Sequence, residues 1–466
     1  MQTQTPEAPA STTTIPPASR PAERRAAAQR RAQFPYRFPT EKRHLGGRFT
    51  VAENSARLLR YFYFARRLSH GLGSWTLAIP EFEVKVETGR HIFWHADAAR
   101  RVRERLHEQE KTLPQVDEFR DAEIDLLVEE MLSAKDTAEL LVGAHQVLGR
   151  ALQTAFQHHM LDSCPVTDVP SIRVMKQILV DYEPMLAWAD AAIEAYIKGG
   201  VDESRLQAWH WHLSGLLASL GGISGTEKRA LRPQPLRIDA KPYVRGVVPE
   251  RDLRFATFKD TGDYNAADKE PRYPSGSYED ERLRFIRTQR DEIDAIEAFG
   301  TFLWDIRFRD FQAEYDLARI TWDEARHSEI GHMTLQAIGY DPYELPNRLT
   351  SSTCRGPMEP EYGMTEINMF GEVAVLRTIH KLIDEARERG DNILAHTSDY
   401  IRADERTHVR KGTTIIKHMT TMQWKDLELK TRELFTECLV ALGAIKMDTD
   451  LFTPLSREEI ERLVGE

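Results

Sequence analysis

The sequence predicts an all-α protein. Apolar residues recur every three or four positions through most of residues 48–222 and again from 281 to about 420, which is the period of a helix with one buried face. Alternation of apolar and polar residues, the period of a strand, is nearly absent. In addition, one pattern occurs twice in the second half, and its apolar positions again follow the helical period.

The composition argues against nucleic acid and membrane as partners. The 466 residues carry a net charge of −10, and the isoelectric point near 5.9 leaves no basic surface for a phosphate backbone. No apolar run approaches the ~20 residues of a membrane span. Cys164, Cys354 and Cys438 lie far apart and form no CxxC pair, which is typical of a reducing cytosol. Because the start also lacks the apolar segment of a secretory signal, we expect a cytoplasmic protein.

The chain divides into five segments. Residues 1–45, rich in Pro, Ala and Thr and then in Arg, predict a disordered tail. Residues 46–222 predict a helical bundle, and residues 223–280, rich in Pro, Gly and Asp, predict a long irregular connector that runs over the surface. Helical periodicity returns in residues 281–420, which predict a second bundle, and residues 421–466 predict C-terminal helices.

The repeated pattern places a carboxylate and an imidazole on the apolar face of a helix. It reads Ile-x-x-Asp-Glu-x-x-His-x-x-x-Gly and begins at Ile320 and again at Ile401. In both copies the Glu and the His lie one turn apart within the apolar stripe. A buried ionised carboxylate costs several kcal/mol unless it is paired or bound to a metal. Two helices with the same arrangement therefore indicate one shared compensating ion site, formed by Glu324, His327, Glu405 and His408.

Two more glutamates occupy apolar stripes upstream of the motifs. Glu372 lies 33 residues before Glu405, and the corresponding position, 32 residues before Glu324, is Glu292. Glu297 is the alternative there, but on a helix it points about 140° away from Glu292. We therefore predict Glu292 as the fourth carboxylate and keep Glu297 as the second choice.

Residues around these positions carry further expectations. Glu366 shares its helical face with charged residues, so we expect it to face solvent. Gly331 and Gly412, one turn beyond each histidine, would leave room beside the site. Asp323 and Asp404 either orient the two histidines by accepting hydrogen bonds from them or are exposed acids beside them.

The resulting set matches a known kind of metal centre. Two helical hairpins each supply Glu from one helix and Glu-x-x-His from the next, which is the ligand inventory of four-helix di-iron carboxylate proteins. Residues 281–420 thus resemble a ferritin-like di-iron carboxylate domain, and the Asp-Glu-Ala-Arg-His stretch at 323–327 is similar to ferritin-like proteins of the tRNA-hydroxylase branch. Carboxylate and imidazole ligands suit iron or manganese. The resemblance implies two iron ions, or a mixed manganese–iron pair, on Glu292, Glu324, His327, Glu372, Glu405 and His408.

The resemblance also implies an enzyme. We expect a non-haem di-iron oxygenase or oxidase that activates O2 at a carboxylate-bridged site, with Glu324 and Glu405 as its catalytic carboxylates. Its partners would be a small organic substrate, O2 and an electron donor, and a homodimer would fit the extra helices. The alternative is a ferritin-like iron-binding or storage protein without an organic substrate. Storage ferritins are short single bundles, so the additional half of this chain favours the enzyme.

The helices before residue 222 carry a weaker version of the repeated pattern. Tyr182 and Met185 stand where Glu and His would be expected. In the other helix Thr88 takes the position of Glu, and only His91 keeps the position of His. We therefore predict a duplicated bundle whose first copy has lost its metal site, with a chance similarity of amphipathic helices as the alternative.

Overall fold

The computed structural model describes residues 21–33, 45–255, 258–259 and 272–445. Helices make up nearly all the regular structure of these residues, which confirms the predicted all-α class. The exception among them is a parallel pair of two-residue strands, β1 (Phe258–Lys259) and β2 (Asn347–Arg348). This pair joins the connector to the second half of the chain.

The first half consists of helices between residues 51 and 219. The first of them begins with a capping box, in which Thr50 accepts from the backbone N–H of Glu53 and the Glu53 carboxylate accepts from the backbone N–H of Thr50. The elements are α2 (Val51–Trp75), α3 (Phe82–His107), α4 (Leu113–Asp117), α5 (Ala122–Leu132), α6 (Thr137–Leu141), the π-helix η2 (Val142–Gly149), α7 (Arg150–Asp162), α8 (Val169–Lys198) and α9 (Glu203–Ser219).

The second half is also helical, and two of its long helices are interrupted. The first is broken between α11 and α12, and the second contains a π-helical turn between α15 and α16. The elements are α11 (Tyr278–Asp291), α12 (Ile293–Asp305), α13 (Phe311–Ala337), η4 (Pro342–Glu344), α14 (Thr350–Arg355), α15 (Pro360–Glu366), the π-helix η5 (Ile367–Gly371), α16 (Glu372–Arg389), α17 (Asn392–Met419) and α18 (Trp424–Ala441).

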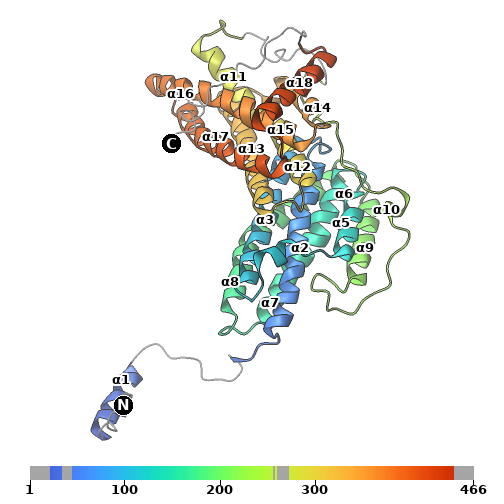
Figure 1. The fold of residues 1–466 in the computed structure, drawn as a ribbon, viewed down its shortest axis with the longest axis vertical. Helices are drawn as coiled ribbons and strands as arrows, with labels where there is room; N and C mark the ends of the chain where they lie inside the picture. The colour runs from blue at the N-terminus through green and yellow to red at the C-terminus, as the bar shows by residue number, and fades with distance from the viewer. Residues whose placement is uncertain (1–20, 34–44, 256–257, 260–271, 446–466) are drawn as a thin grey trace, which may run out of the picture.

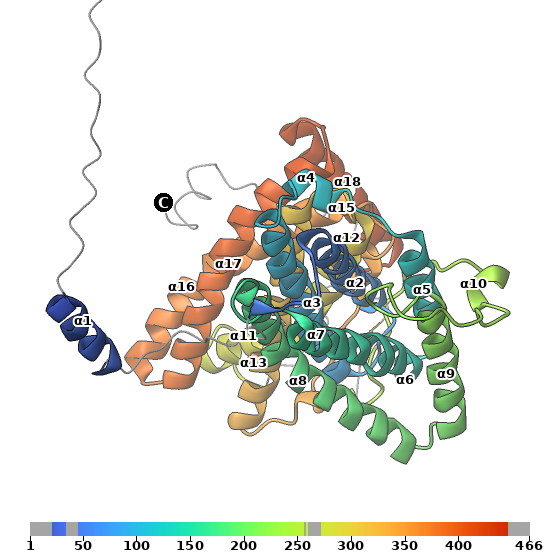
Figure 2. The ribbon, with the colours of Figure 1, turned by 90° about the horizontal axis from the view of Figure 1, so that it is seen from below.

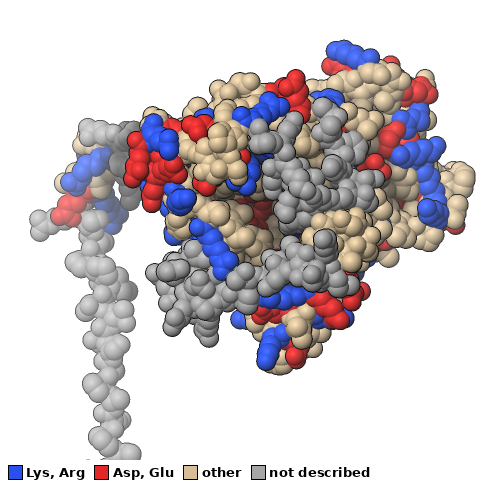
Figure 3. Space-filling view, turned by 90° about the horizontal axis from the view of Figure 1, so that it is seen from above, with Lys and Arg blue, Asp and Glu red and all other residues tan. Residues whose placement is uncertain are grey.

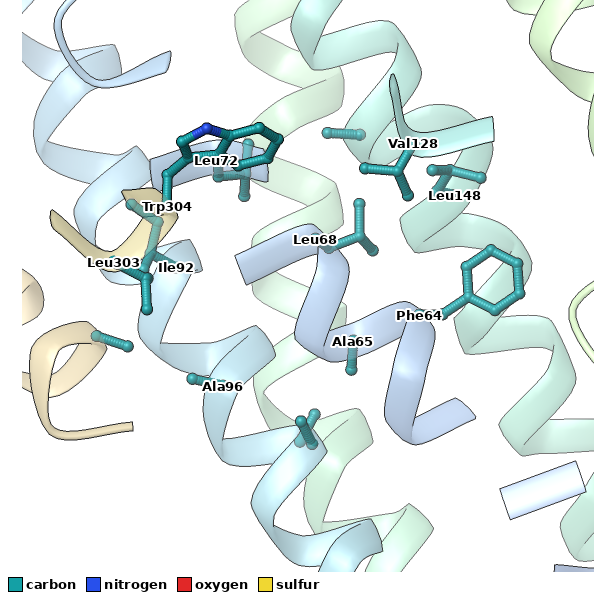
Figure 4. Close-up of a cluster of buried hydrophobic side chains, with 14 of the residues drawn as sticks. Phe64, Ala65, Leu68, Leu72, Ile92, Ala96, Val128, Leu148, Leu303 and Trp304 are labelled. Atoms are coloured by element: carbon teal, nitrogen blue, oxygen red, sulfur yellow. The ribbon is translucent and has the colours of Figure 1, made fainter. Parts of the chain in front are cut away.

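The two halves pack against each other through their first hairpins. In Figures 1 and 2 the blue-to-green half meets the yellow-to-red half where α2 lies on α12 and α3 lies on α13. Gly73 of α2 and Gly300 of α12 touch directly, since a Cβ on Gly73 would lie 2.6 Å from the carbonyl oxygen of Gly300. Figure 4 shows Leu72 of α2 and Trp304 of α12 in one hydrophobic cluster. The core is therefore continuous across the junction.

A buried ion cluster reinforces the same junction. Arg66 of α2 makes two hydrogen bonds, of 2.7 and 2.8 Å, to the Glu314 carboxylate of α13. His70 Nε2 lies 2.9 Å from the same carboxylate. Burial disfavours the charge on Glu314, but His70 and Arg66 hold its pKa down at about 2. Glu314 is thus a paired carboxylate, although it too lies inside a helical core.

The connector differs from the irregular surface segment that the sequence predicts. It contains a short helix, α10 (Arg237–Ala240), and it places Arg251 in the interior. Arg237 pairs with Glu139 of the first half at 2.6 Å, and Arg245 pairs with Asp305 of the second half at 2.6 Å. The connector therefore ties the two halves together, because its arginines reach carboxylates on both sides.

Part of the N-terminal tail is helical in the structure. Within the tail that we expected to be disordered, Pro21–Gln33 form helix α1. Its Ala, Arg, Gln and Glu are strong helix formers and Pro stands at its first position, so local propensity favours a helix. The rest of the tail, 1–20 and 34–44, lies outside the described residues, as does 446–466 of the C-terminal segment beyond α18.

Within the described part of the chain, no helix combines the length and apolar character needed to cross a membrane. Figure 3 shows basic and acidic side chains interspersed among the described residues of the upper face.

Candidate metal centre

The six predicted ligand residues converge from the helices of the second half. Glu292 stands between α11 and α12, Glu372 opens α16, and the two Glu-x-x-His motifs lie within α13 and α17. The side chains of Glu324, His327, Glu405 and His408 are at most 1% exposed, whereas those of Glu292 and Glu372 are 12% and 8% exposed. Glu292 and Glu372 are thus the more exposed members of the cluster, and Glu324 lines the adjoining cavity with them.

The ligand atoms form two overlapping groups. In one group, an atom from each of its four residues lies within 4.8 Å of the others, and the same holds for the second group. Glu324 and Glu405 belong to both groups, and each group adds one glutamate and one histidine. The first group is Glu292, Glu324, His327 and Glu405. The second group is Glu324, Glu372, Glu405 and His408. Such a set of residues could hold two neighbouring cations, with Glu324 and Glu405 within reach of both.

Glu297, the second choice from the sequence, belongs to a different cluster. Its carboxylate is fully buried and pairs with Lys85 of α3 and Arg251 of the connector. Burial opposes ionisation of Glu297, but Arg251 and Lys85 lower its pKa below the usual value. The structure therefore places Glu292 in the candidate metal centre and Glu297 in an ion cluster between the two halves.

The break that carries Glu292 depends on the first motif glycine. Glu292 has ψ near 0°, which ends α11 and starts α12. A Cβ on Gly331 would lie 2.2 Å from the backbone nitrogen of Arg290, just before the break. Backbone atoms cannot rotate away, so only glycine allows α13 to approach the interrupted helix this closely.

The second motif glycine has the same role at the other interrupted helix. Glu372 follows directly on the π-helix η5, a wide turn that is common at functional sites. A Cβ on Gly412 would lie 1.9 Å from Asn368 Oδ1 in η5. The space that the sequence predicted beside each glycine is occupied, by the backbone at Arg290 beside Gly331 and by the Asn368 side chain beside Gly412.

The prediction for Glu366 was wrong. Glu366 is buried and accepts a 2.7 Å hydrogen bond from Arg355 Nε. The helical wheel assumed uniform turns through Glu372, but the π-helical turn between these two glutamates changes the direction in which they point. Nothing in the apolar spacing marks that turn.

The two motif aspartates orient the histidines of the opposite motif. His327 Nε2 donates to Asp404 Oδ2 at 3.3 Å, and His408 Nε2 donates to Asp323 Oδ2 at 3.4 Å. Arg326 pairs with both aspartates. With a proton on Nε2, each imidazole presents its Nδ1 to the carboxylates. Of the two readings left open by the sequence, the structure therefore supports the orienting one.

The charges of the cluster are only partly compensated. Burial raises the pKa of Glu292 to about 8, and nearby Glu324 and Glu372 act in the same direction. Burial and the same two neighbours also raise the pKa of Glu405 well above its usual value. Burial opposes protonation of His327, but contact with Glu292 and other carboxylates raises its pKa well above the usual value. Without added positive charge, the carboxylates must therefore share protons with the histidines.

Several buried ligand atoms also lack hydrogen bonds among the described residues. His327 Nδ1 and Glu292 Oε2 lie 2.9 Å apart, yet neither makes a hydrogen bond of acceptable geometry. Glu324 Oε1 and Glu405 Oε1 also make no hydrogen bond among the described residues. Buried atoms outside the cluster are in this state too, among them Glu297 Oε2 and His95 Nε2. What fits divalent metal ions here is the convergence of carboxylate oxygens and imidazole nitrogens.

Comparison of the chain with protein-family models, curated proteins and solved structures finds no match. What the centre can do must therefore be inferred from its own geometry and donor atoms.

The first half holds a buried cluster of neutral groups where the sequence suggested a degenerate copy. His95 Nδ1 lies 2.8 Å from the Tyr182 hydroxyl, and His91 Nδ1 lies 3.0 Å from His145 Nε2. Burial lowers the pKa of His95 to about 3 and that of His145 to about 4. Tyr182, which replaces Glu, and His91, which keeps the position of His, therefore contact other polar side chains of the same core.

Replacement of Gly331 by alanine tests the role of the motif glycine. The added methyl would meet the backbone at Arg290, so we expect Gly331→Ala to lower the free energy of unfolding by about 1–3 kcal/mol. Because the break would shift, metal affinity should fall as well. Gly371→Ala is the matched control, since nothing lies within 4 Å of a Cβ there. Equal stability of the two variants in chemical denaturation would contradict the proposed role.

The buried histidines predict acid sensitivity. His95 and His145, with pKa values of about 3 and 4 in the folded state and 6.5 when unfolded, take up protons on unfolding between those values. Their contribution is therefore fully present above pH 6.5 and is lost as the pH falls towards 4, on the order of 3 kcal/mol for each. The double variant His95→Gln/His145→Gln should show a smaller loss of unfolding free energy across this range than the wild type. Parallel pH profiles would refute this assignment.

Proposed function

We propose that this protein is a non-haem di-iron oxygenase or oxidase that acts on a small organic substrate. The observation that carries the proposal is the sharing of Glu324 and Glu405 between two ligand groups, each of which adds one glutamate and one histidine. A mononuclear site needs no such sharing. Two bridging carboxylates, with open positions left on each metal, are what a dimetal centre for O2 chemistry requires.

The fold that would support this centre is a ferritin-like four-helix bundle. Its four helices would be α11–α12, α13, α15–η5–α16 and α17, which carry all six ligands. The first half would be a tandem copy of the same bundle that no longer binds metal. The contact between α2–α3 and α12–α13 would then be a pseudo-symmetric interface within one chain.

Each ligand has a distinct role in this proposal. Two reduced iron ions bound here would supply the electrons that activate O2. Glu324 and Glu405, whose side chains are at most 1% exposed, would be the carboxylates available to both ions. Glu292 and Glu372 border a cavity of about 280 Å³, so O2 and substrate would approach from their side.

Other residues of the chain would orient the ligands and exclude water. Asp404 and Asp323 keep a proton on Nε2 of each histidine, which leaves the lone pair of Nδ1 free for a metal. Val373 and Val409, next to Glu372 and His408 in sequence, belong to an apolar cluster in the core. Such surroundings strengthen electrostatic interactions in the site and limit side reactions with water.

Iron is the first choice of metal, and a manganese–iron pair is the second. The four carboxylates are hard ligands that both metals accept, and the described site offers no thiolate to favour zinc or copper(I). Electrons would have to come from a separate donor. The cytoplasm is the compartment that the cysteine content favours.

The metal assignment predicts stoichiometric binding. Protein loaded without oxygen should hold about two Fe(II) per chain. His408→Ala and Glu405→Ala should lower this number sharply, while the helical circular dichroism remains near that of the wild type. Glu329→Ala on α13 is the matched control, because that carboxylate is 43% exposed and pairs with Arg90. Retention of both iron ions by His408→Ala and Glu405→Ala would show that the ligands are wrong.

The same centre could serve iron storage, and the fate of oxidised iron separates the two functions. An oxygenase or oxidase keeps its two ions when reduced protein meets O2, whereas a store passes them on and accepts more. We expect about two Fe(II) oxidised per chain and both retained after gel filtration. Tens of ferric ions accumulated per chain would instead establish storage.

A further inference from the structure

A groove on the second half leads from the surface towards the carboxylate cluster. It lies between α11 and α16, has a volume of about 480 Å³, and falls in the size range of small-molecule sites. The two helices lie at the upper end of the molecule in Figure 1. α11 packs mainly on α13 and α16 packs mainly on α17, which leaves the space between α11 and α16 open.

The groove continues into the cavity beside the candidate metal centre. Thr288 of α11 and Ala374 and Val375 of α16 line both spaces. The inner cavity is bordered by Glu292 and Glu372, the two more exposed ligands. A molecule that lies in the groove with one end past Ala374 would therefore reach the open side of the cluster.

The lining of the groove combines an apolar floor with a cationic rim. Its apolar side chains are Phe285, Ala374, Val375 and Leu382. Arg284, Arg377 and Lys381 supply positive charge, against one carboxylate, Glu281. Arg284 lies 3.1 Å from Asp280 and Lys381 lies 3.9 Å from Glu281, while Arg377 has no carboxylate within 4.0 Å among the described residues.

The charge balance selects one class of ligand. The rim carries an excess of positive charge, although the whole protein has a net charge of −10. An anionic group would pair with the rim arginines, and a flexible hydrocarbon chain would cover the apolar floor. A cationic amphipath would cover the floor but be repelled by the rim, and a purely polar molecule would gain nothing from the floor.

We propose that this groove binds an amphipathic organic anion, with its anionic group at Arg377 and Arg284 and its hydrocarbon chain directed past Ala374 towards Glu292 and Glu372. The inference that this ligand is the substrate of the oxygenase rests on the proposed function. The inference that the groove binds it depends only on the groove. The anion would stay at the rim, and a carbon of the chain would lie nearest the ligands.

The test is equilibrium binding of decanoate to the full-length, metal-free protein by calorimetry, below the concentration at which decanoate forms micelles. Decanoate should bind the wild type at least about tenfold more tightly than decyltrimethylammonium, which has the same chain and the opposite charge. Arg377→Glu should weaken decanoate binding by about tenfold or more, and Ala374→Trp, which fills the passage, should do the same. Both replaced residues are exposed, so these variants should fold.

Arg410→Glu is the matched control, because Arg410 is exposed on α17 and does not line the groove. It should change decanoate binding less than about twofold. Equal binding of the anion and the cation, or wild-type affinity in both Arg377→Glu and Ala374→Trp, would overturn the inference, as would the absence of saturable decanoate binding.

Iron content measured on parallel samples separates this inference from the proposed function. Neither Arg377 nor Ala374 is a candidate ligand, so both variants should load iron as the wild type does. Selective decanoate binding by a chain that takes up no iron would support the groove and contradict the di-iron centre. Two iron ions per chain without decanoate binding would contradict the groove alone.

Discussion

Burial of four carboxylates in one helical core is the constraint on which the second half of this protein depends. Each ionised carboxylate removed from water costs several kcal/mol unless positive charge is close. Elsewhere in the molecule that charge comes from side chains: Arg66 and His70 compensate Glu314, and Lys85 and Arg251 compensate Glu297. In the candidate metal centre two histidines face four glutamates, and no lysine or arginine belongs to the two ligand groups. Two divalent cations would complete this balance. The contrast between these clusters, all buried in the same molecule, is the main physical argument for metal at one of them.

The geometry of the centre depends on irregular turns and on the glycines that admit them. A regular helix would place the upstream glutamate of each hairpin elsewhere, so Glu292 requires the break between α11 and α12 and Glu372 requires the π-helical turn before α16. Gly331 and Gly412 allow the neighbouring helices to approach these turns. Residues of both turns, Glu292 among them, line the cavity beside the cluster. The first half supports this arrangement from outside. Helix α2 packs on α12, which begins directly after Glu292, and α3 packs on α13, which carries the first motif.

Much of this could be predicted from the sequence, because burial of a carboxylate leaves a clear periodic signal. Glu324, His327, Glu405 and His408 stand in apolar stripes, and the similar spacing of Glu292 and Glu372 before them, 32 and 33 residues, predicted the remaining pair. Three features escaped prediction for physical reasons. Glu366 was misplaced because a π-helical turn changes helical phase without altering composition. The ion cluster of Glu297 depends on Lys85 and Arg251, which are distant in sequence. The groove between α11 and α16 reflects how whole helices pack, and no local pattern encodes it.

The most direct test is a crystal structure of iron-loaded protein with anomalous diffraction measured on both sides of the iron absorption edge. If the account is correct, two iron peaks will lie side by side between Glu324 and Glu405, one next to His327 and Glu292 and the other next to His408 and Glu372. Their separation should be about 3.5–4 Å, as in other two-metal sites. A single peak, or iron bound only at surface carboxylates while this cluster holds none, would contradict the account.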